Sequence, residues 1–401
     1  MRYRIFGKTG LAMPVFSCGL MRSMYSWQDV PASRIPESRQ QELAAVVDSA
    51  LKSGITHLET ARGYGSSERQ LAKVLANYPR DSFILQTKVG LDDDPDRFAA
   101  NVQDSLDRLG QKRVDLLALH GINDHRSLWQ ACRPGGCLAA VRKLQEQGKV
   151  DWIGFSGHGD VKIIQSAIAH EGDGGFDYMN LHWYTILQKN SPALAAAAER
   201  NMGVFIISPT DKGGMLQHPS EKLCELSGSL TPMQFNDLFC LQRPEIHTIS
   251  VGAACPGDFE DHLRMLPLLE DHDLVSDIYR KWEHAMEEGC GYCRPDALWR
   301  KLPSWDQTPG YMNISFILWL YNLARGWDLL EFARIRYRLL GLEMSWVAGN
   351  DAGDVRRYDL SEIAGQVGLS KNELTVMLED AHDLLGKEQP GYSVAGVVSA
   401  G

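Results

Sequence analysis

The sequence predicts an α/β protein whose fold is a (β/α)8 TIM barrel, with a hairpin before the barrel and an all-helical subdomain after it. Short apolar runs alternate with amphipathic stretches over the first two thirds of the chain. The alternation then stops, and only helical patterns follow. Eight runs have the length of buried parallel strands. They cover residues 15–20, 56–61, 83–89, 114–120, 150–156, 178–183, 203–208 and 247–253.

The opening segment predicts a hairpin, because YRIF and LAMPVFSCGL flank the turn sequence GKTG. Amphipathic segments such as 39–54 and 96–110 repeat apolar residues every three or four positions and end at glycine, as helices do. A doubly wound open sheet is the alternative fold. It normally has a glycine-rich phosphate loop after its first strand, whereas this chain continues with CGLMRSMYSW. The barrel is therefore favoured.

The pattern divides the chain into a barrel domain at 1–271 and a helical domain at 272–401. The second part is rich in aromatic residues and contains no further strand pattern. Ser370 and Glu373 have the spacing of a capping box, which predicts the start of a helix. The final residues, 393–401, are expected to form a loose end.

Composition excludes several functional classes. The net charge of −10 argues against nonspecific nucleic-acid binding, which requires a basic face. No run of about 18 apolar residues predicts a membrane span, and the first residues lack the apolar stretch of a secretory signal. The eight cysteines are mostly isolated, which favours a reducing cytoplasm over a disulfide framework.

Four residues at strand ends suggest an active site: Glu59, Tyr64, Lys88 and His120. They occur in HLETARGYGSSE (57–68), FILQTKVG (83–90) and VDLLALHG (114–121). In a parallel barrel the C-terminal strand ends meet on one face, where such barrels carry out chemistry. A phenol, an ammonium, a carboxylate and an imidazole on that face can donate a proton to a carbonyl oxygen.

These motifs resemble the aldo-keto reductases. HLETARGYGSSERQLAKVL, QTKVG and LLALHG match successive elements of that superfamily over about residues 1–270. ETARGYG, IGFSGHG, SPTDKGGML and the helical tail are similar to a bacterial branch with a ferredoxin-like C-terminal extension. The resemblance implies an NAD(P)H-dependent oxidoreductase that reduces an aldehyde or ketone, or catalyses the reverse reaction.

Each of the four residues then has an expected role. Tyr64 is the general acid, and its pKa must be lowered for donation near neutral pH. Lys88 supplies the positive charge that favours the phenolate, and Glu59 holds Lys88 in place. His120 orients the substrate carbonyl. The family normally has aspartate where this chain has Glu59, so the carboxylate has a longer arm here.

The resemblance also implies a nicotinamide dinucleotide as the hydride donor, NADP(H) by the habit of the family, with NAD(H) as the alternative. The expected carboxamide and phosphate contacts are Ser156, Gly157, Asn180, Ser208, Thr210, Lys212, Gly252 and Ala253. Ile207 replaces an aromatic residue that stacks on the nicotinamide in many members. Ala254, Asp258 and His262 replace basic or amide groups near the 2′-phosphate, so the preference between the two dinucleotides stays open.

The segment 287–303 resembles the cluster-binding stretch of the ferredoxin-like extension. Its four ligand positions are Glu287, Cys290, Cys293 and Asp296. A four-iron cluster usually needs four cysteines, so we expect a degenerate domain with no iron–sulfur cluster and no other metal. A zinc site that uses the two cysteines is a weaker alternative.

Aromatic residues near strand ends are candidates for the substrate pocket: Tyr25, Trp27, Trp183 and Tyr184. Such a lining suits a small organic carbonyl compound, although these side chains could equally anchor loops. The competing function is a non-catalytic sensor or scaffold that binds the nicotinamide nucleotide. An iron–sulfur electron-transfer protein is disfavoured by the missing thiolates. The pattern gives no oligomeric state.

Overall fold

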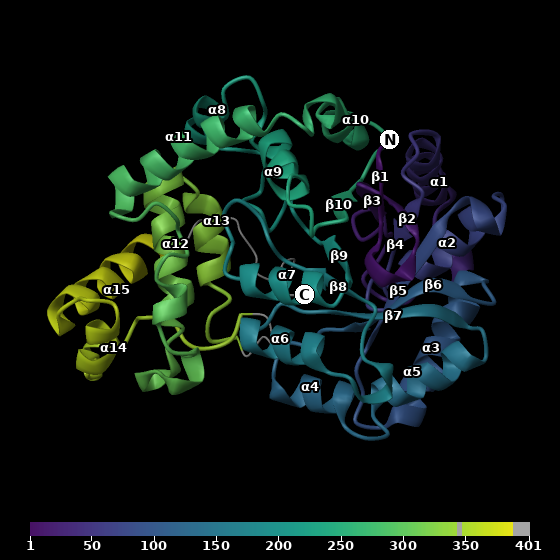
Figure 1. Cartoon of the computed structure of the whole chain (residues 1–401), viewed down its shortest axis with the longest axis horizontal. Coiled ribbons are helices and arrows are strands. Elements are labelled where there is room, and N and C mark those ends of the chain that lie inside the picture. Colours follow the sequence, from purple (N-terminus) through teal and green to yellow (C-terminus); the bar gives the residue numbers. More distant parts are fainter. Residues whose placement is uncertain (343–346, 388–401) are drawn as a thin grey trace. The chain divides into compact units, whose positions relative to one another are not determined.

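The computed structural model describes residues 1–342 and 347–387, and it confirms the predicted (β/α)8 barrel (Figure 1). Within these ranges, eight parallel strands close into one barrel in the order β10-β3-β4-β5-β6-β7-β8-β9. The strands are β3 (Phe16–Gly19), β4 (His57–Glu59), β5 (Ile84–Gly90), β6 (Val114–His120), β7 (Val150–Ser156), β8 (Tyr178–Leu181), β9 (Gly203–Ile206) and β10 (Thr248–Gly252).

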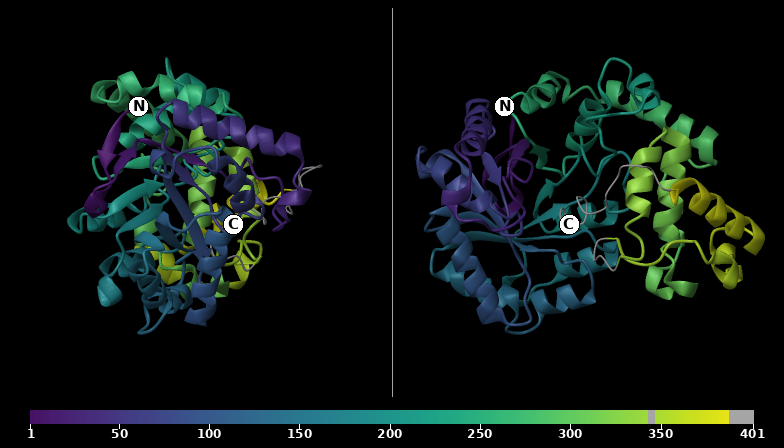
Figure 2. Two further views of the ribbon diagram at one scale, coloured as in Figure 1. Left: turned by 90° about the vertical axis from the view of Figure 1, so that its right-hand side faces the viewer. Right: turned by 180° about the vertical axis from the view of Figure 1, so that it is seen from behind.

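Helices lie on the outside of the barrel strands, as Figures 1 and 2 show. They are α1 (Glu37–Lys52), α2 (Ser67–Leu75), α3 (Pro95–Leu109), α4 (His125–Cys132), α5 (Cys137–Glu146), α6 (Val161–Ala169), α7 (Ser191–Glu199) and α10 (Asp258–Arg264). The two helices predicted at 39–54 and 96–110 are α1 and α3. Asp94 caps the start of α3, and Gly110, with φ +61°, ends it as predicted.

The predicted hairpin forms, and it closes one end of the barrel. Strands β1 (Tyr3–Ile5) and β2 (Ala12–Pro14) pair antiparallel. A bend at Val15 separates β2 from β3. Phe6 follows β1 and packs on Tyr178, with ring centroids 5.6 Å apart. A Cβ at Gly203 would lie 2.7 Å from the Phe6 ring, so only glycine fits there. Tyr178 is the first residue of β8 and Gly203 is the first residue of β9, so the hairpin covers the N-terminal ends of the barrel strands.

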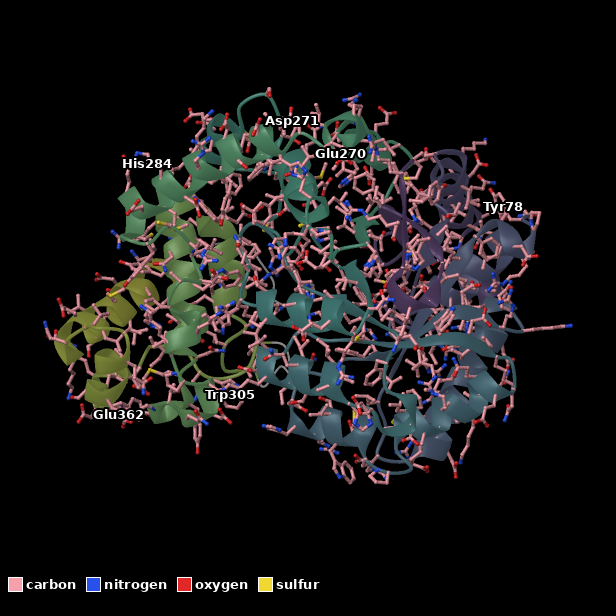
Figure 3. The ribbon with its side chains drawn as sticks, in the orientation of Figure 1. Tyr78, Glu270, Asp271, His284, Trp305 and Glu362 are labelled. Atoms are coloured by element: carbon pink, nitrogen blue, oxygen red, sulfur yellow. The ribbon has the colours of Figure 1, made fainter. Side chains whose placement is uncertain are left out.

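The chain divides into two compact units. The first contains Met1–Trp183, Asn190–Thr210 and Asn236–Glu270, and the second contains Tyr184–Lys189, Asp211–Phe235 and the chain from Asp271. Figure 3 labels Glu270 and Asp271, the neighbouring residues at which the chain passes into the second unit. Two segments within the predicted barrel domain at 1–271, Tyr184–Lys189 and Asp211–Phe235, thus belong to the second unit. The division into domains at 1–271 and 272–401 stays a prediction.

The regular elements described in the second unit are helices, together with two isolated β-bridges. They are α8 (Glu221–Ser227), α11 (His272–Cys290), α12 (Ile314–Trp327), α13 (Leu330–Tyr337), α14 (Ser361–Gln366) and α15 (Lys371–Leu385), while α9 (Pro232–Leu241) contains a unit boundary. The core of this unit includes Trp282 and Trp327, which meet edge to face, and Trp327 Nε1 donates to the Trp282 carbonyl at 2.8 Å. The predicted capping box at Ser370 and Glu373 is confirmed.

In the described part of the chain, none of the helices is both long and apolar enough to cross a membrane. The expected loose end at 393–401 lies outside the described residues.

A buried carboxyl group lies between the barrel and its surrounding helices. Glu68, in the first turn of α2, is fully buried, and its Oε1 accepts a hydrogen bond from Thr87 Oγ1 at 2.6 Å. Burial raises the pKa of Glu68 to about 7, even though the Thr87 hydrogen bond favours the charged form. The folded protein therefore retains a proton that the unfolded chain releases at lower pH.

We predict that this carboxyl group makes the protein less stable as the pH rises. Between the ordinary glutamate pKa of about 4.5 and a pKa of about 7, the folded state binds more protons than the unfolded state, so stability falls with rising pH. Relative to the wild type, Glu68→Gln is expected to gain at most about 3 kcal/mol between pH 5 and pH 8. Urea unfolding at both pH values measures the difference. The exposed Glu146→Gln is the control, and parallel pH profiles for wild type and Glu68→Gln would contradict the prediction.

Candidate active site

The structure brings all four predicted catalytic residues to the C-terminal face of the barrel. Glu59 ends β4, Lys88 lies two residues before the end of β5, and His120 ends β6. Tyr64 follows β4 in a turn in which its amide donates to the Ala61 carbonyl at 3.0 Å. Because the strands are parallel, their C-terminal ends share one face. Local strand patterns therefore suffice to place these side chains near one another.

The centre of the site is a buried ion pair. Lys88 Nζ contacts Glu59 Oε1 and donates to the Thr60 carbonyl at 3.0 Å. Lys88 is completely buried and Glu59 is 4% exposed. A buried ammonium needs such partners, because an unpaired charge is very costly in a low-dielectric interior. The longer arm of Glu59, compared with the aspartate usual in the family, does reach Lys88.

Tyr64 lies against both neighbours. Lys88 Nζ is 4.5 Å from the centroid of the Tyr64 ring, and the ring meets His120 edge to face with centroids 6.1 Å apart. An ammonium over an aromatic face is attracted to it, most strongly where water is excluded. The ion pair therefore positions the Tyr64 ring, and the ring contacts the imidazole.

The electrostatics of Tyr64 differ from the sequence-based expectation. Burial raises the pKa of the Tyr64 phenol, whereas we expected Lys88 to lower it. Glu59 offsets the Lys88 charge, and that charge lies over the ring face. Burial also lowers the pKa of Lys88, while contact with Glu59 acts in the opposite direction. Tyr64 is therefore a protonated phenol at neutral pH.

Two buried polar side chains lie on the neighbouring strands β7 and β8. Ser156 and Asn180 are paired in register, and both are completely buried. Ser156 Oγ accepts from the Gly121 amide at 3.1 Å. Among the described residues, neither Nδ2 nor Oδ1 of Asn180 has a hydrogen-bond partner. A buried amide without partners is costly and points to a missing ligand. A carboxamide has the complementary donor and acceptor, so this pair fits the nicotinamide end of a dinucleotide.

The other expected cofactor contacts of the first unit also follow strand ends. The Gly157 amide donates to the Asn180 carbonyl at 3.3 Å, and Ser208 adopts a left-handed backbone with φ +54° after β9. Thr210 and Ala253 are buried, and the Gly252 carbonyl accepts from Arg22 Nη1 at 3.1 Å. A non-glycine residue with positive φ is strained, and such strain is common at ligand sites. Lys212 belongs to the second unit.

The loop after β10 differs from the expected phosphate site. The Asp258 carboxylate accepts from the amides of Ala254 at 2.7 Å and Cys255 at 3.2 Å. Partial burial acts to raise the pKa of Asp258, but these hydrogen bonds hold it below its usual value. An anionic group therefore already occupies these donors.

His262, at a position where the resemblance expects a group near the 2′-phosphate, has a partner within the protein. It is buried, and its Nδ1 lies 2.5 Å from Oδ2 of Asp237 on α9. Burial raises the pKa of Asp237, although His262 opposes that shift. This histidine therefore joins α10 to α9.

Two of the expected pocket residues lie on the loop beside Tyr64. Tyr25 is 42% exposed and Trp27 is 36% exposed. The Tyr25 amide donates to Gln70 Oε1 at 2.7 Å, and the Ser66 amide donates to the Ser26 carbonyl at 3.0 Å. These bonds hold the loop against the turn that carries Tyr64.

The other two pocket candidates are packing residues instead. Trp183 is 3% exposed, stacks on Phe239 at 5.0 Å, and donates from Nε1 to Ser191 Oγ at 3.0 Å. Tyr184, in the second unit, is completely buried and exchanges backbone hydrogen bonds with Leu187. Neither side chain is open at a surface, so the structure favours the alternative of loop anchors for both.

A contact between two histidines that follow the carboxamide candidates Ser156 and Asn180 in the chain was not predicted from the sequence. His182 Nε2 lies 2.6 Å from His158 Nδ1, and the rings are 4.3 Å apart. Each histidine comes two residues after Ser156 or Asn180. The shared offset from two neighbouring strands was the available signal, because residues two apart point to the same side.

The predicted cluster remnant has other partners in the second unit. Asp296 is buried and accepts from the Gln188 amide at 2.8 Å, and Cys290 Sγ donates to the Asn322 carbonyl at 3.4 Å. In the ranges that the structure describes, no group of three or more His, Cys, Asp or Glu side chains could hold a metal ion. Asp296 thus has a structural use, and a cluster-free domain stays a prediction.

We predict that the Glu59 carboxylate stabilises the folded protein mainly through its charge. Glu59→Gln leaves the buried Lys88 ammonium without its counter-ion, which should lower the free energy of unfolding by about 3–5 kcal/mol. Glu59→Asp keeps the charge on a shorter arm and should lose clearly less. Urea unfolding at pH 7 measures both variants. Equal losses for the two, or a Glu59→Gln protein as stable as wild type, would disprove this role.

Comparison with known sequences identifies relatives of this arrangement. The profile of the Aldo/keto reductase family matches residues 19–234. L-glyceraldehyde 3-phosphate reductase of Escherichia coli K12 is 28% identical over 175 residues, which cover 39% of this chain and 46% of that protein. The chain thus spans less than half the length of that relative. L-galactose dehydrogenase of Arabidopsis thaliana is 26% identical over 278 residues, 60% of this chain and 83% of that protein.

Solved structures show the same fold. A thermostable aldo-keto reductase in complex with the inhibitor epalrestat superposes with a TM-score of 0.59 at 20% identity, covering 69% of this chain and 98% of that one. The holo form of an aldo-keto reductase from Bacillus halodurans gives 0.56 at 19% identity, covering 69% and 96%. At this identity the likeness concerns the fold alone. The family profile, however, matches more than half of the sequence, so the chain belongs to the aldo/keto reductase family, a family of nicotinamide-dependent oxidoreductases.

Proposed function

We propose that this protein is an NAD(P)H-dependent oxidoreductase that reduces an aldehyde or ketone to an alcohol, or catalyses the reverse reaction. The observation that carries the proposal is the cluster of the buried Glu59–Lys88 ion pair with the partly exposed Tyr64 and His120 at the C-terminal barrel face. Its family membership and the reductase and dehydrogenase relatives support this reaction class.

The mechanism follows from what these side chains can do. When bound, a reduced nicotinamide supplies the hydride that the protein itself lacks. Tyr64 donates the proton to the carbonyl oxygen, because its raised pKa keeps the phenol protonated at neutral pH. His120, beside the Tyr64 ring, hydrogen-bonds the same oxygen and orients the carbonyl. Lys88, held by Glu59, positions the ring, and its ammonium stabilises the negative charge that develops on the phenol oxygen.

The proposed cofactor site combines the buried polar pair with the loops after β9 and β10. Ser156 and Asn180 hold the carboxamide, which would satisfy the orphaned Asn180 amide. The dinucleotide phosphates are assigned to residues of the first unit on the following loops: Gly157, Ser208, Thr210, Gly252 and Ala253. Asp258 on the β10 loop repels a 2′-phosphate, so we expect NADH to serve at least as well as NADPH.

Substrate and setting are further parts of the proposal. Tyr25 and Trp27, partly exposed beside the Tyr64 turn, favour a small organic carbonyl compound with an apolar part. We place the chain in the bacterial branch with a ferredoxin-like C-terminal extension, which its motifs and its helical tail resemble. All eight cysteines carry free thiols, which suits the reducing cytoplasm.

The first prediction of this function concerns the proton donor. Tyr64→Phe removes the only atom of that side chain that can donate, so turnover of a panel of aldehydes should fall at least about a hundredfold. Dinucleotide affinity should stay unchanged. Loss of reduced-nicotinamide absorbance measures turnover. Tyr78→Phe is the matched control, because Tyr78 precedes β5 and lies near the N-terminal strand ends (labelled in Figure 3).

Two results would contradict this assignment. Unchanged turnover in Tyr64→Phe would exclude Tyr64 as the acid. Dinucleotide binding by the wild type without turnover of any carbonyl compound would instead favour the competing function, a nucleotide-binding sensor or scaffold.

The second prediction concerns the orphaned amide. Asn180→Leu removes a buried polar group that has no partner in the described residues, so the free protein should keep or gain stability. Dinucleotide affinity should fall about tenfold, which corresponds to about 1.4 kcal/mol. Thermal unfolding and fluorescence titration with NADH measure the two effects. A protein that loses stability and keeps its affinity would exclude Asn180 from the cofactor site.

A further inference from the structure

The loop after β3 carries the pocket candidates Tyr25 and Trp27, and we call its residues 23–29 the pocket loop. All seven residues are described in the structure, and they belong to no helix or strand. The loop lies directly on the turn after β4, because a Cβ at Gly65 would be 2.1 Å from the Ser26 carbonyl oxygen. An irregular segment of this kind needs side-chain contacts to keep one position.

Asp29 ends the pocket loop and is shared by two arginines. Arg69 on α2 donates to it twice, from Nε to Oδ1 at 2.6 Å and from Nη2 to Oδ2 at 3.0 Å. Such a bidentate pair fixes direction as well as distance. Arg108 on α3 approaches the same carboxylate, with its Nη2 2.8 Å from Oδ2. The Arg69 hydrogen bond lowers the pKa of Asp29 below its usual value, against the effect of partial burial, so the carboxylate is charged at neutral pH.

The same network reaches the turn that carries Tyr64. The Arg108 side chain is only 10% exposed, and its Nε lies 2.8 Å from Asp104 Oδ2. Asp104 in turn contacts Arg62 Nη1. Arg62 precedes Tyr64 by two residues, and its amide donates to the Lys88 carbonyl at 2.9 Å. Two carboxylates and three guanidinium groups therefore connect the pocket loop with the segment that positions the proposed proton donor.

We propose that Asp29 is a positioning residue that holds the pocket loop against the Tyr64 turn and thereby sets the affinity for the apolar part of the carbonyl substrate. The anchoring of the loop stands apart from the proposed function, whereas its effect on the substrate rests on that function. Asp29 acts through the loop that carries Tyr25 and Trp27. Its loss should therefore change KM rather than the chemical step.

The competing explanation is an ion network that only stabilises the fold. In that case Asp29→Asn lowers the unfolding temperature and leaves KM unchanged. The two explanations also differ in their dependence on salt. The side chains of Asp29 and Arg69 are 33% and 32% exposed, so dissolved salt screens their attraction. If this pairing sets the position of the loop, salt should raise KM in the wild type.

The test is steady-state kinetics of the full chain at pH 7 with NADH and two uncharged aldehydes, benzaldehyde and acetaldehyde. In Asp29→Asn the KM of benzaldehyde should rise at least about fivefold, while kcat and the Kd of NADH should change less than about twofold. The KM of acetaldehyde, which has little apolar surface, should rise less. Asp29→Glu keeps the charge and should lie closer to wild type. Asp48→Asn, which removes an exposed pair with Lys52 on α1, is the matched control and should behave as wild type.

Hydrogen exchange measures the anchoring of the loop without turnover. The Tyr25 amide donates to Gln70 Oε1 at 2.7 Å and the Ser26 amide donates to Ser66 Oγ at 3.0 Å, so both amides report opening of the loop. Exchange over residues 23–29 should be at least about tenfold faster in Asp29→Asn and unchanged in the control. About 0.5 M NaCl should raise both exchange and the KM of benzaldehyde in the wild type, but not in Asp29→Asn.

The outcomes separate this role from the proposed function. Unchanged exchange over the pocket loop in Asp29→Asn would overturn the anchor, even if turnover depends on Tyr64. Faster exchange with an unchanged KM, or a fall in kcat alone, would overturn the role in substrate affinity. Faster exchange in a protein that turns over no aldehyde of a panel would support the anchor and refute the function. Thermal unfolding of each variant shows that it is folded under the assay conditions.

Discussion

The arrangement of the active site depends on one constraint, the burial of a lysine charge inside a barrel. Lys88 has no exposed surface, so it needs a counter-ion and a further acceptor, which are Glu59 and the Thr60 carbonyl. These partners fix how β4 and β5 face the interior. The Tyr64 ring then covers the ammonium, and His120 contacts the ring. The Glu59–Lys88 ion pair thus positions the Tyr64 phenol, which in turn contacts the His120 imidazole. These residues lie at or just after the ends of β4, β5 and β6.

Polarity changes along the barrel and confines the chemistry to one end. The N-terminal strand ends are closed by an apolar cluster around Phe6 and Tyr178. Further along, Ser17 Oγ lies 2.6 Å from His57 Nδ1, and burial lowers the pKa of His57 to about 3, so this histidine is neutral. The buried Glu59–Lys88 ion pair lies beyond this layer, toward the C-terminal strand ends. The site therefore lies where loops, rather than core packing, complete its surroundings.

Several residues whose types suggested ligands or pocket walls serve the architecture instead. His262 pairs with Asp237, Asp296 accepts from the Gln188 amide, and Trp183 stacks on Phe239. Each of these groups is buried, and a buried polar or aromatic group requires a specific partner. The presence of a partner thus distinguishes these residues from Asn180, whose amide is buried without one among the described residues.

The sequence alone predicted the barrel, the hairpin, the helix limits near Gly110 and the capping box at Ser370, because these follow from local periodicity and turn chemistry. It also predicted that Glu59, Tyr64, Lys88 and His120 lie together, since parallel strand ends share one face. It could not predict the direction of the Tyr64 pKa shift, the inward turn of His262 or the contact of Arg336 with Asp211. These features depend on which distant side chains share a buried space, and only the tertiary structure decides that.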